Sequence, residues 1–174
     1  MITQHKNILS EELYNEVYDY TKMIMEEKSM QFTTSTLTWR ELLKGNSVPA
    51  LIYDLSTDNS ATISKLKKDI ESKIPYFVNN LYFHILPNSS YINWHVDAAH
   101  IKAGLTLYLN QEWDKNWGGY LMYEDGDEIK AIKPDKNLAI LQENTDRHCV
   151  SSVNNGADLR ISLQFFLTKS KKIV

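Results

Sequence analysis

The sequence predicts a mainly β fold with helices at its N-terminal end, because the spacing of apolar residues changes near residue 76 from a helical to an alternating period. Beyond that point, short alternating segments are separated by turn signals at 87–90, 125–126 and 154–156. Eight strands without intervening helices favour a double-stranded β-helix, which is a jelly roll. The expected strands lie near 79–86, 91–97, 103–109, 119–124, 128–132, 138–142, 148–153 and 159–167.

Three helices are expected before the sheet. Ser10 is a suitable N-cap for the first. Its inward face is formed by residues at helical spacing, namely Leu13, Val17, Tyr20 and Ile24. A capping box at 38–41 begins a second, short helix that Gly45 can end. A third runs from about residue 59 to 73, stopped by Pro75. We expect these helices to cover one outer face of the sheet.

The length of 174 residues suits a single domain, 1–174, in which 1–75 form a helical support and 76–168 a cupin-like jelly-roll core. A net charge of −3 and no visible basic face argue against nucleic acid as a partner. No apolar run approaches the roughly 18 residues of a membrane span, and the N-terminus lacks a signal-peptide pattern. The single cysteine, Cys149, fits a reducing cytoplasm, where we expect the protein to be.

The most informative motif is His95-x-Asp97, followed 51 residues after Asp97 by His148. Two imidazoles and one carboxylate are the donor set of non-heme Fe(II) sites that keep coordination positions open. The spacing suits a strand, because side chains at i and i+2 project to the same side. Of the three other histidines, we expect His5 and His100 to be ordinary core or surface residues.

Arg160 lies inside the last expected strand, where a charge on the inner face needs a partner. Its planar donors could hold a dicarboxylate cosubstrate by the end farthest from a metal. Thr106 and Tyr108 share one face of their strand, as Arg160, Ser162 and Gln164 do on theirs. Such a polar lining inside an apolar barrel is what a dicarboxylate requires.

At these residues the chain resembles the 2-oxoglutarate- and Fe(II)-dependent dioxygenases, particularly their prolyl 4-hydroxylase-like branch. The resemblance covers roughly residues 80 to 167, and residues 1–75 carry none of it. Its motif residues come in the family's order: His95, Asp97, Leu107, Tyr108, Leu109, Asn110, Trp113, Trp117, Gly118, Gly119, Tyr120, Leu121, Pro134, His148, Arg160 and Ser162.

The resemblance implies three cofactors or cosubstrates, Fe(II), 2-oxoglutarate and O2. It assigns the iron to His95, Asp97 and His148. It assigns the distal carboxylate of 2-oxoglutarate to Arg160, with Tyr108 and Ser162 beside it.

Other parts of the pocket are less defined. Relatives often carry a tyrosine about ten residues before the first iron-ligand histidine, and here that place falls to Tyr82, His84 or neither. The aromatic residues near the motifs are candidates for contact with the substrate or for packing at the rim: Tyr91, Trp94 and Trp117.

The resemblance implies hydroxylation of an unactivated C–H bond, coupled to decarboxylation of 2-oxoglutarate to succinate. A carboxylate at position 97, rather than Gly or Ala, favours hydroxylation over halogenation. The substrate could be a prolyl or other peptidyl group, or a small amino-acid-like molecule. Two alternatives remain: a cupin-like metal enzyme that does not use 2-oxoglutarate, and a non-catalytic jelly-roll binding module. The oligomeric state stays open.

Overall fold

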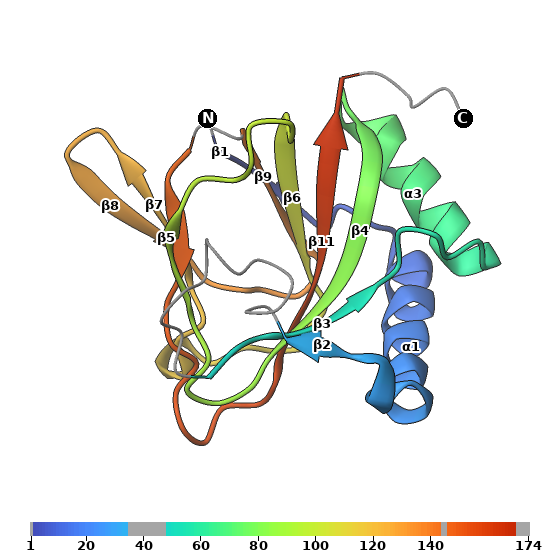
Figure 1. The fold of residues 1–174 in the computed structure, drawn as a ribbon, viewed down its shortest axis with the longest axis horizontal. Coiled ribbons are helices and arrows are strands. Elements are labelled where there is room, and N and C mark those ends of the chain that lie inside the picture. Colours follow the sequence, from blue (N-terminus) through green and yellow to red (C-terminus); the bar gives the residue numbers. More distant parts are fainter. Residues whose placement is uncertain (1, 35–47, 144–145, 170–174) are drawn as a thin grey trace.

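The computed structural model describes residues 2–34, 48–143 and 146–169 and folds them into two antiparallel sheets (Figure 1). Residues of both sheets line one cavity. The major sheet has seven strands, in the order β1 (Ile2–Lys6), β9 (Leu138–Glu143), β6 (Ala103–Tyr108), β11 (Arg160–Thr168), β4 (Phe77–Leu86), β3 (Leu51–Asp54) and β2 (Thr33–Thr34). The minor sheet has four, in the order β5 (Ile92–His95), β10 (His148–Val150), β7 (Leu121–Asp125) and β8 (Glu128–Ile132). This is the double-stranded β-helix that the sequence predicts.

All eight expected strands are present as β4 to β11, with ends that differ from the expected ones by up to three residues, as at β10, which stops at Val150 and not at 153. Two of the differences concern the site. β5 ends at His95, so Asp97 lies in the loop that follows and not in the strand. β7 begins at Leu121 and not at 119. Gly118 and Gly119 precede it with φ angles of 69° and 66°, a left-handed backbone that cannot continue a strand.

Residues 1–75, expected to form a helical support, contain three strands besides their helices. β1, β2 and β3 come from this part of the chain and extend both edges of the major sheet. β1 pairs with β9, and β3 pairs with β4. β1 buries little side-chain surface, so it lacks the apolar alternation that predicts a strand. β3 has four residues and β2 has two, which is too short for a periodic signal.

Two helices, α1 (Glu11–Glu27) and α3 (Ala61–Lys73), cover the outer face of the major sheet as expected (Figure 1). Each begins at a serine N-cap, with the Ser10 hydroxyl accepting from Leu13 N over 3.2 Å and the Ser60 hydroxyl from Ile63 N over 3.3 Å. Short 3-10 turns occupy Ser29–Gln31 and Lys115–Trp117. The helix expected at 38–45 lies outside the described residues. Among the helices described, none is both long and apolar enough to cross a membrane.

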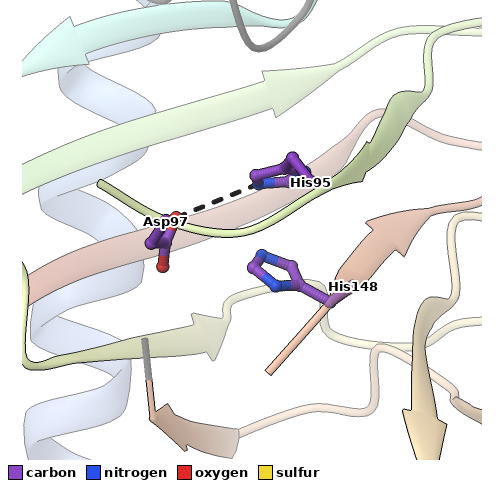
Figure 2. Close-up of side chains that lie close together, drawn as sticks. All are labelled: His95, Asp97 and His148. Carbon is purple, nitrogen blue, oxygen red and sulfur yellow. Dashed lines mark ion pairs between the residues drawn. The ribbon is translucent and has the colours of Figure 1, made fainter. Parts of the chain in front are cut away.

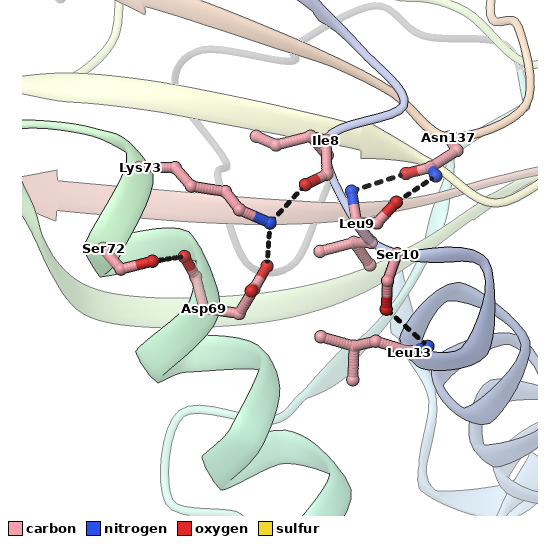
Figure 3. A network of polar contacts seen from close by, with 8 residues as sticks. All are labelled: Ile8, Leu9, Ser10, Leu13, Asp69, Ser72, Lys73 and Asn137. Atoms are coloured by element: carbon pink, nitrogen blue, oxygen red, sulfur yellow. Dashed lines mark hydrogen bonds and ion pairs between the residues drawn. The ribbon is translucent and has the colours of Figure 1, made fainter.

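A buried asparagine ties the segment between β1 and α1 to the sheet (Figure 3). Asn137, which has a φ of 54°, accepts from Leu9 N over 3.0 Å and donates to Leu9 O over 2.8 Å. From α3, Lys73 donates to Ile8 O over 2.5 Å and pairs with Asp69 over 2.6 Å. These bonds connect the segment before α1 to Asn137, which directly precedes β9, and connect α3 to that same segment.

The three central strands of the major sheet have one apolar and one polar face. Their outward residues pack with the helices in a single core cluster that includes Leu81, Phe83, Leu105, Leu107, Leu163 and Phe165. The alternate residues face the minor sheet: Tyr82, His84, Thr106, Arg160, Ser162 and Gln164 all line the cavity between the sheets. The strand period therefore places polar side chains on the inside of an apolar barrel, as the sequence predicts.

Candidate active site

Three side chains of the types that bind metals converge where β5 and β10 meet (Figure 2). His95 ends β5 and His148 begins β10, and the two are direct partners across the pair, with ring centroids 4.2 Å apart. Asp97 follows in the loop, and its Oδ1 lies 3.9 Å from Nε2 of His95. One ligand atom from each residue lies within 4.8 Å of the others. A single ion could therefore contact all three.

Both histidines are oriented by a backbone carbonyl two residues earlier. Nδ1 of His95 lies 2.7 Å from Asn93 O, and Nδ1 of His148 lies 2.9 Å from Asp146 O. A carbonyl oxygen can only accept, so Nδ1 carries the proton and the lone pair of each ring lies on Nε2, the atom that a metal would bind. In His148 the amide nitrogen of Gln142 also lies 2.9 Å from Nε2. Burial, followed by the neighbouring charge of His148, lowers the pKa of His95 and favours the neutral ligand form.

The carboxylate also fits a metal. Asp97 Oδ2 is buried and has no hydrogen-bond partner among the described residues. A buried carboxylate is costly unless its charge is paired, and a cation bound at Oδ1, the oxygen nearer to Nε2 of His95, would supply that charge. In the described ranges no other group of three or more His, Cys, Asp or Glu side chains could hold a metal. Two imidazoles and one carboxylate fit Fe(II) with open positions.

The triad opens into a cavity of about 200 Å³ between the two sheets. Arg160 lies in its wall and is 2% exposed. Its Nε donates to Gly119 O over 2.7 Å and its Nη1 to the Ser162 hydroxyl over 3.4 Å. The centre of its guanidinium lies 4.9 Å from the centre of the Tyr108 ring. No carboxylate of the described residues pairs with it, and a guanidinium stays protonated even though burial lowers the pKa of Arg160.

The segment from Asn110 to Gly119 wraps around Arg160. The Asn110 side chain accepts from Ile161 N over 2.9 Å and donates to Leu159 O over 2.7 Å, so it holds the backbone on both sides of Arg160. Trp113 donates to Gly118 O over 2.9 Å and fixes the turn whose next carbonyl receives Arg160. The motif residues between Asn110 and Gly119 thus fix the position of the buried Arg160 guanidinium.

Polar groups flank the guanidinium. Ser162 of β11 is the register partner of His84 on β4 and of Tyr108 on β6. Burial raises the pKa of the Tyr108 hydroxyl, while the nearby positive charge of Arg160 lowers it in part. Burial, with a contribution from the Arg160 charge, lowers the pKa of His84 to about 3, so this imidazole is neutral. Tyr82 and His84 both line the cavity, and His84 is the one whose titration the Arg160 charge affects.

The structure does not bring the three aromatic candidates into the cavity lining. Trp117 packs edge-on against Trp113, with ring centroids 5.2 Å apart. Trp94 lies beneath the guanidinium of Arg147, 5.5 Å from its centre. Tyr91 precedes β5 and is half-buried. A contact between these residues and a substrate requires a substrate that extends beyond the cavity.

Sequence reasoning missed several residues of the cavity. His100, expected to be an ordinary core or surface residue, is exposed but stands in the cavity wall. Gln142 is 2% exposed, and its amide nitrogen lies 2.9 Å from ring nitrogens of His148. The pairing of β9 with β6, which sets Gln142 opposite Gly104, explains its position. No local pattern around residue 142 carries that information.

The chain matches known proteins in two comparisons, one with family models and one with solved structures. The family model described as the 2OG-Fe(II) oxygenase superfamily matches residues 80–168, more than half of the chain. A search of curated proteins with this chain finds no match. Among solved structures, a prolyl hydroxylase from Trichoplax adhaerens, in complex with a peptide fragment of the oxygen degradation domain of hypoxia inducible factor, has a TM-score of 0.80 at 17% identity. The alignment covers 97% of this chain and 83% of that one.

Two further structures share the fold. A Pseudomonas putida prolyl-4-hydroxylase has a TM-score of 0.77 at 12% identity, with 98% of this chain and 93% of that chain covered. A non-heme alpha ketoglutarate dependent epimerase from nogalamycin biosynthesis has a TM-score of 0.72 at 10% identity, with 94% and 76% covered. At these identities the likeness shows the fold. The family match shows more: the chain belongs to the 2OG-Fe(II) oxygenase superfamily, whose enzymes use Fe(II), 2-oxoglutarate and O2.

Proposed function

We propose that the chain is a hydroxylase that inserts oxygen into an unactivated C–H bond and consumes one 2-oxoglutarate per turnover. In this proposal His95, Asp97 and His148 hold the iron, and Arg160, Tyr108 and Ser162 hold the far carboxylate of 2-oxoglutarate. When bound, Fe(II) and 2-oxoglutarate supply the chemistry in which O2 gives one oxygen atom to the substrate and one to succinate, with release of CO2.

The observation that carries the proposal is Arg160, a buried cation without a carboxylate partner in the described part of the chain, in the wall of the cavity that holds the triad. A buried charge is costly unless it is paired. One carboxylate of a dicarboxylate can pair with this guanidinium while the other end reaches the metal. If Arg160 served only to hold Gly119 O and Ser162, its guanidinium would not also need to line the cavity.

Each neighbouring group supports this use. Gly119 O occupies the Nε hydrogen of Arg160 and so directs the remaining N–H groups toward Ser162 and the cavity. Tyr108 does not line the cavity but lies against Arg160; its hydroxyl is buried, with a raised pKa, and therefore stays protonated and can donate to a carboxylate that reaches Arg160. His84 stays neutral, so Arg160 is the fixed positive charge at this end of the cavity among the described residues.

The substrate side is expected to recognise a group of low charge. Apart from Arg160 and the three proposed ligands, the ionisable residues of the described lining are Tyr82, His84 and His100. Among the residues that the structure describes, no second Arg or Lys lines the cavity to pair with the carboxylate of a free amino acid. Amides such as Asn80 and Gln164 instead offer hydrogen bonds of the kind that peptide groups form. We therefore propose a peptidyl substrate, prolyl or other, ahead of a free amino acid.

The test measures succinate release and O2 uptake by the purified protein with Fe(II) and 2-oxoglutarate, with and without a library of peptides and amino acids. We expect iron-dependent succinate formation that increases with the correct substrate, together with a mass increase of 16 Da in that substrate, the mass of one oxygen atom. No succinate under any condition, despite bound iron and 2-oxoglutarate, would contradict the proposal.

A further inference from the structure

The space beside Gly104 is bordered by Asp97, the proposed carboxylate ligand of the metal, and by the side chains of Gln164 and Gln142. A Cβ atom at Gly104 would lie 3.1 Å from Nε2 of Gln164, 3.2 Å from Oδ2 of Asp97 and 3.6 Å from Cγ of Gln142. The amide nitrogen of Gln164 and the outer oxygen of Asp97 therefore face the same methyl-sized space. Gly104 leaves that space open because it has no side chain.

The orientation of Gln164 is set by a neighbouring hydroxyl. Thr106, its register partner on β6, donates from Oγ1 to Gln164 Oε1 over 2.6 Å. Since the amide oxygen is taken by this bond, the amide nitrogen is the end that faces Asp97. Thr106 is 8% exposed, so water competes little for its hydroxyl.

Asp97 needs such a donor. Its Oδ2 is buried and forms no hydrogen bond with the residues that the structure describes. A carboxylate that gives one oxygen to a metal is normally held by a hydrogen bond to the other, and this bond fixes the direction of the ligand. The Gln164 amide and the Asp97 carboxylate border one space, and rotation of these two side chains would bring the donor to the acceptor.

We infer that Thr106 and Gln164 form a positioning pair for Asp97, in which Gln164 Nε2 donates to the carboxylate oxygen that does not bind the metal. The inference rests on the proposed function, because it takes Asp97 as a metal ligand. It assigns to the pair no contact with iron and no part in proton transfer. Gly104 serves the pair by keeping the space between the amide and the carboxylate free.

The test measures Mn²⁺ binding by calorimetry to the chelator-treated full chain, without cosubstrate or substrate. Gln164→Leu should bind Mn²⁺ about 10- to 100-fold more weakly, the usual effect of removing a partner of a metal ligand. Thr106→Val should weaken binding in the same direction by a smaller factor, because the amide remains but loses its fixed orientation. Thr106→Ser keeps the hydroxyl and should bind like wild type.

Matched controls make the same changes elsewhere. Gln4→Leu, on the edge strand β1, and Thr62→Val, on α3, should leave Mn²⁺ affinity unchanged. The absorption spectrum of bound Co²⁺, which reports ligand geometry, should change in Gln164→Leu and not in Gln4→Leu. Thermal unfolding of the metal-free variants separates lost affinity from lost folding, and Gln164→Leu alone decides the test if Thr106→Val does not fold.

Two outcomes overturn different claims. If Gln164→Leu and Thr106→Val bind Mn²⁺ like wild type while Asp97→Ala does not, the positioning pair is refuted and the proposed function stands. If Asp97→Ala itself binds Mn²⁺ like wild type, Asp97 is not a ligand, and the metal site on which the proposed function depends is refuted as well.

Discussion

The carbonyl oxygen of Gly119 accepts a hydrogen bond of 2.7 Å from Nε of Arg160. The same glycine leaves room for the side chain that it holds, since a Cβ at Gly119 would lie 2.8 Å from Cδ of Arg160. One residue thus fixes both the orientation of the guanidinium and the path of its aliphatic stem. The relationship gives a physical reason for a glycine pair in this loop.

Gly119→Ala should therefore damage the cosubstrate pocket. We expect the apparent KM for 2-oxoglutarate to rise at least about tenfold, the equivalent of about 1.4 kcal/mol, with metal affinity unchanged. Gly126→Ala is the matched control, because Gly126 has a similar φ of 63° but nothing within 4 Å of its added methyl group. An equal KM effect in both variants would mean that backbone strain, and not contact with Arg160, is responsible.

Asn110→Ala should destabilise the fold. The change leaves Ile161 N and Leu159 O without their partner, and an unsatisfied buried group costs about 1–3 kcal/mol. We expect the free energy of unfolding in urea to fall by about 2–3 kcal/mol on the same principle. Asn116→Ala is the control: Asn116 is exposed, and its loss should cost no more than about 0.5 kcal/mol. If the free energy of unfolding of Asn110→Ala falls by less than about 1 kcal/mol, the two hydrogen bonds of Asn110 do not stabilise the fold as proposed.

His95→Ala and Asp97→Ala should each abolish iron-dependent consumption of 2-oxoglutarate. We expect both variants to remain folded, because the core lies between the helices and the outer face of the major sheet, away from the triad. Circular dichroism and thermal unfolding check the fold, and succinate release checks turnover. A wild-type rate in either variant would refute the assignment of that residue as a ligand.

The neutral state of His84 should make the fold sensitive to acid. Its folded-state pKa of about 3 lies below the ordinary value of 6.5, so between these values the unfolded chain takes up a proton that the folded chain does not. The contribution of His84 is therefore fully present above pH 6.5 and is lost toward pH 3, at up to about 1.4 kcal/mol per pH unit. Urea unfolding of the metal-free protein at several pH values should show a shallower pH dependence for His84→Gln. Identical slopes would contradict the prediction.

Periodicity predicted the parts of the fold that depend on alternation within one strand. The polar face shared by Arg160, Ser162 and Gln164 is confirmed by their positions along the cavity, and the helix faces are confirmed for α1 and α3. The N-terminal strands were missed because an exposed edge strand has no apolar period and a strand of two to four residues is too short to show one.

Site residues could be predicted from the sequence where their side-chain type itself indicates a function, as for metal ligands. They could not be predicted where only the pairing of distant strands brings a residue into the site. His95, Asp97 and His148 could be singled out because imidazoles and carboxylates are metal ligands, and the structure brings them together, while their role as iron ligands stays a prediction. Asp97 was expected in a strand and lies in a loop. Gln142 reaches His148 only through the register between β9 and β6, which pairs residues 38 positions apart at Gly104.

The central claim is that Arg160 holds 2-oxoglutarate beside a metal bound by the triad. The most direct test is titration of 2-oxoglutarate into the anaerobic Fe(II) protein, followed by the visible charge-transfer absorption of the complex. Arg160→Ala should weaken binding about 10- to 100-fold, because a charge-assisted hydrogen bond in a buried site contributes about 1.5–3 kcal/mol. Arg160→Lys should retain part of the affinity, since it keeps the charge and loses the planar fork. Fe(II) affinity should stay at the wild-type value in both. Unchanged affinity for 2-oxoglutarate in Arg160→Ala would contradict the account.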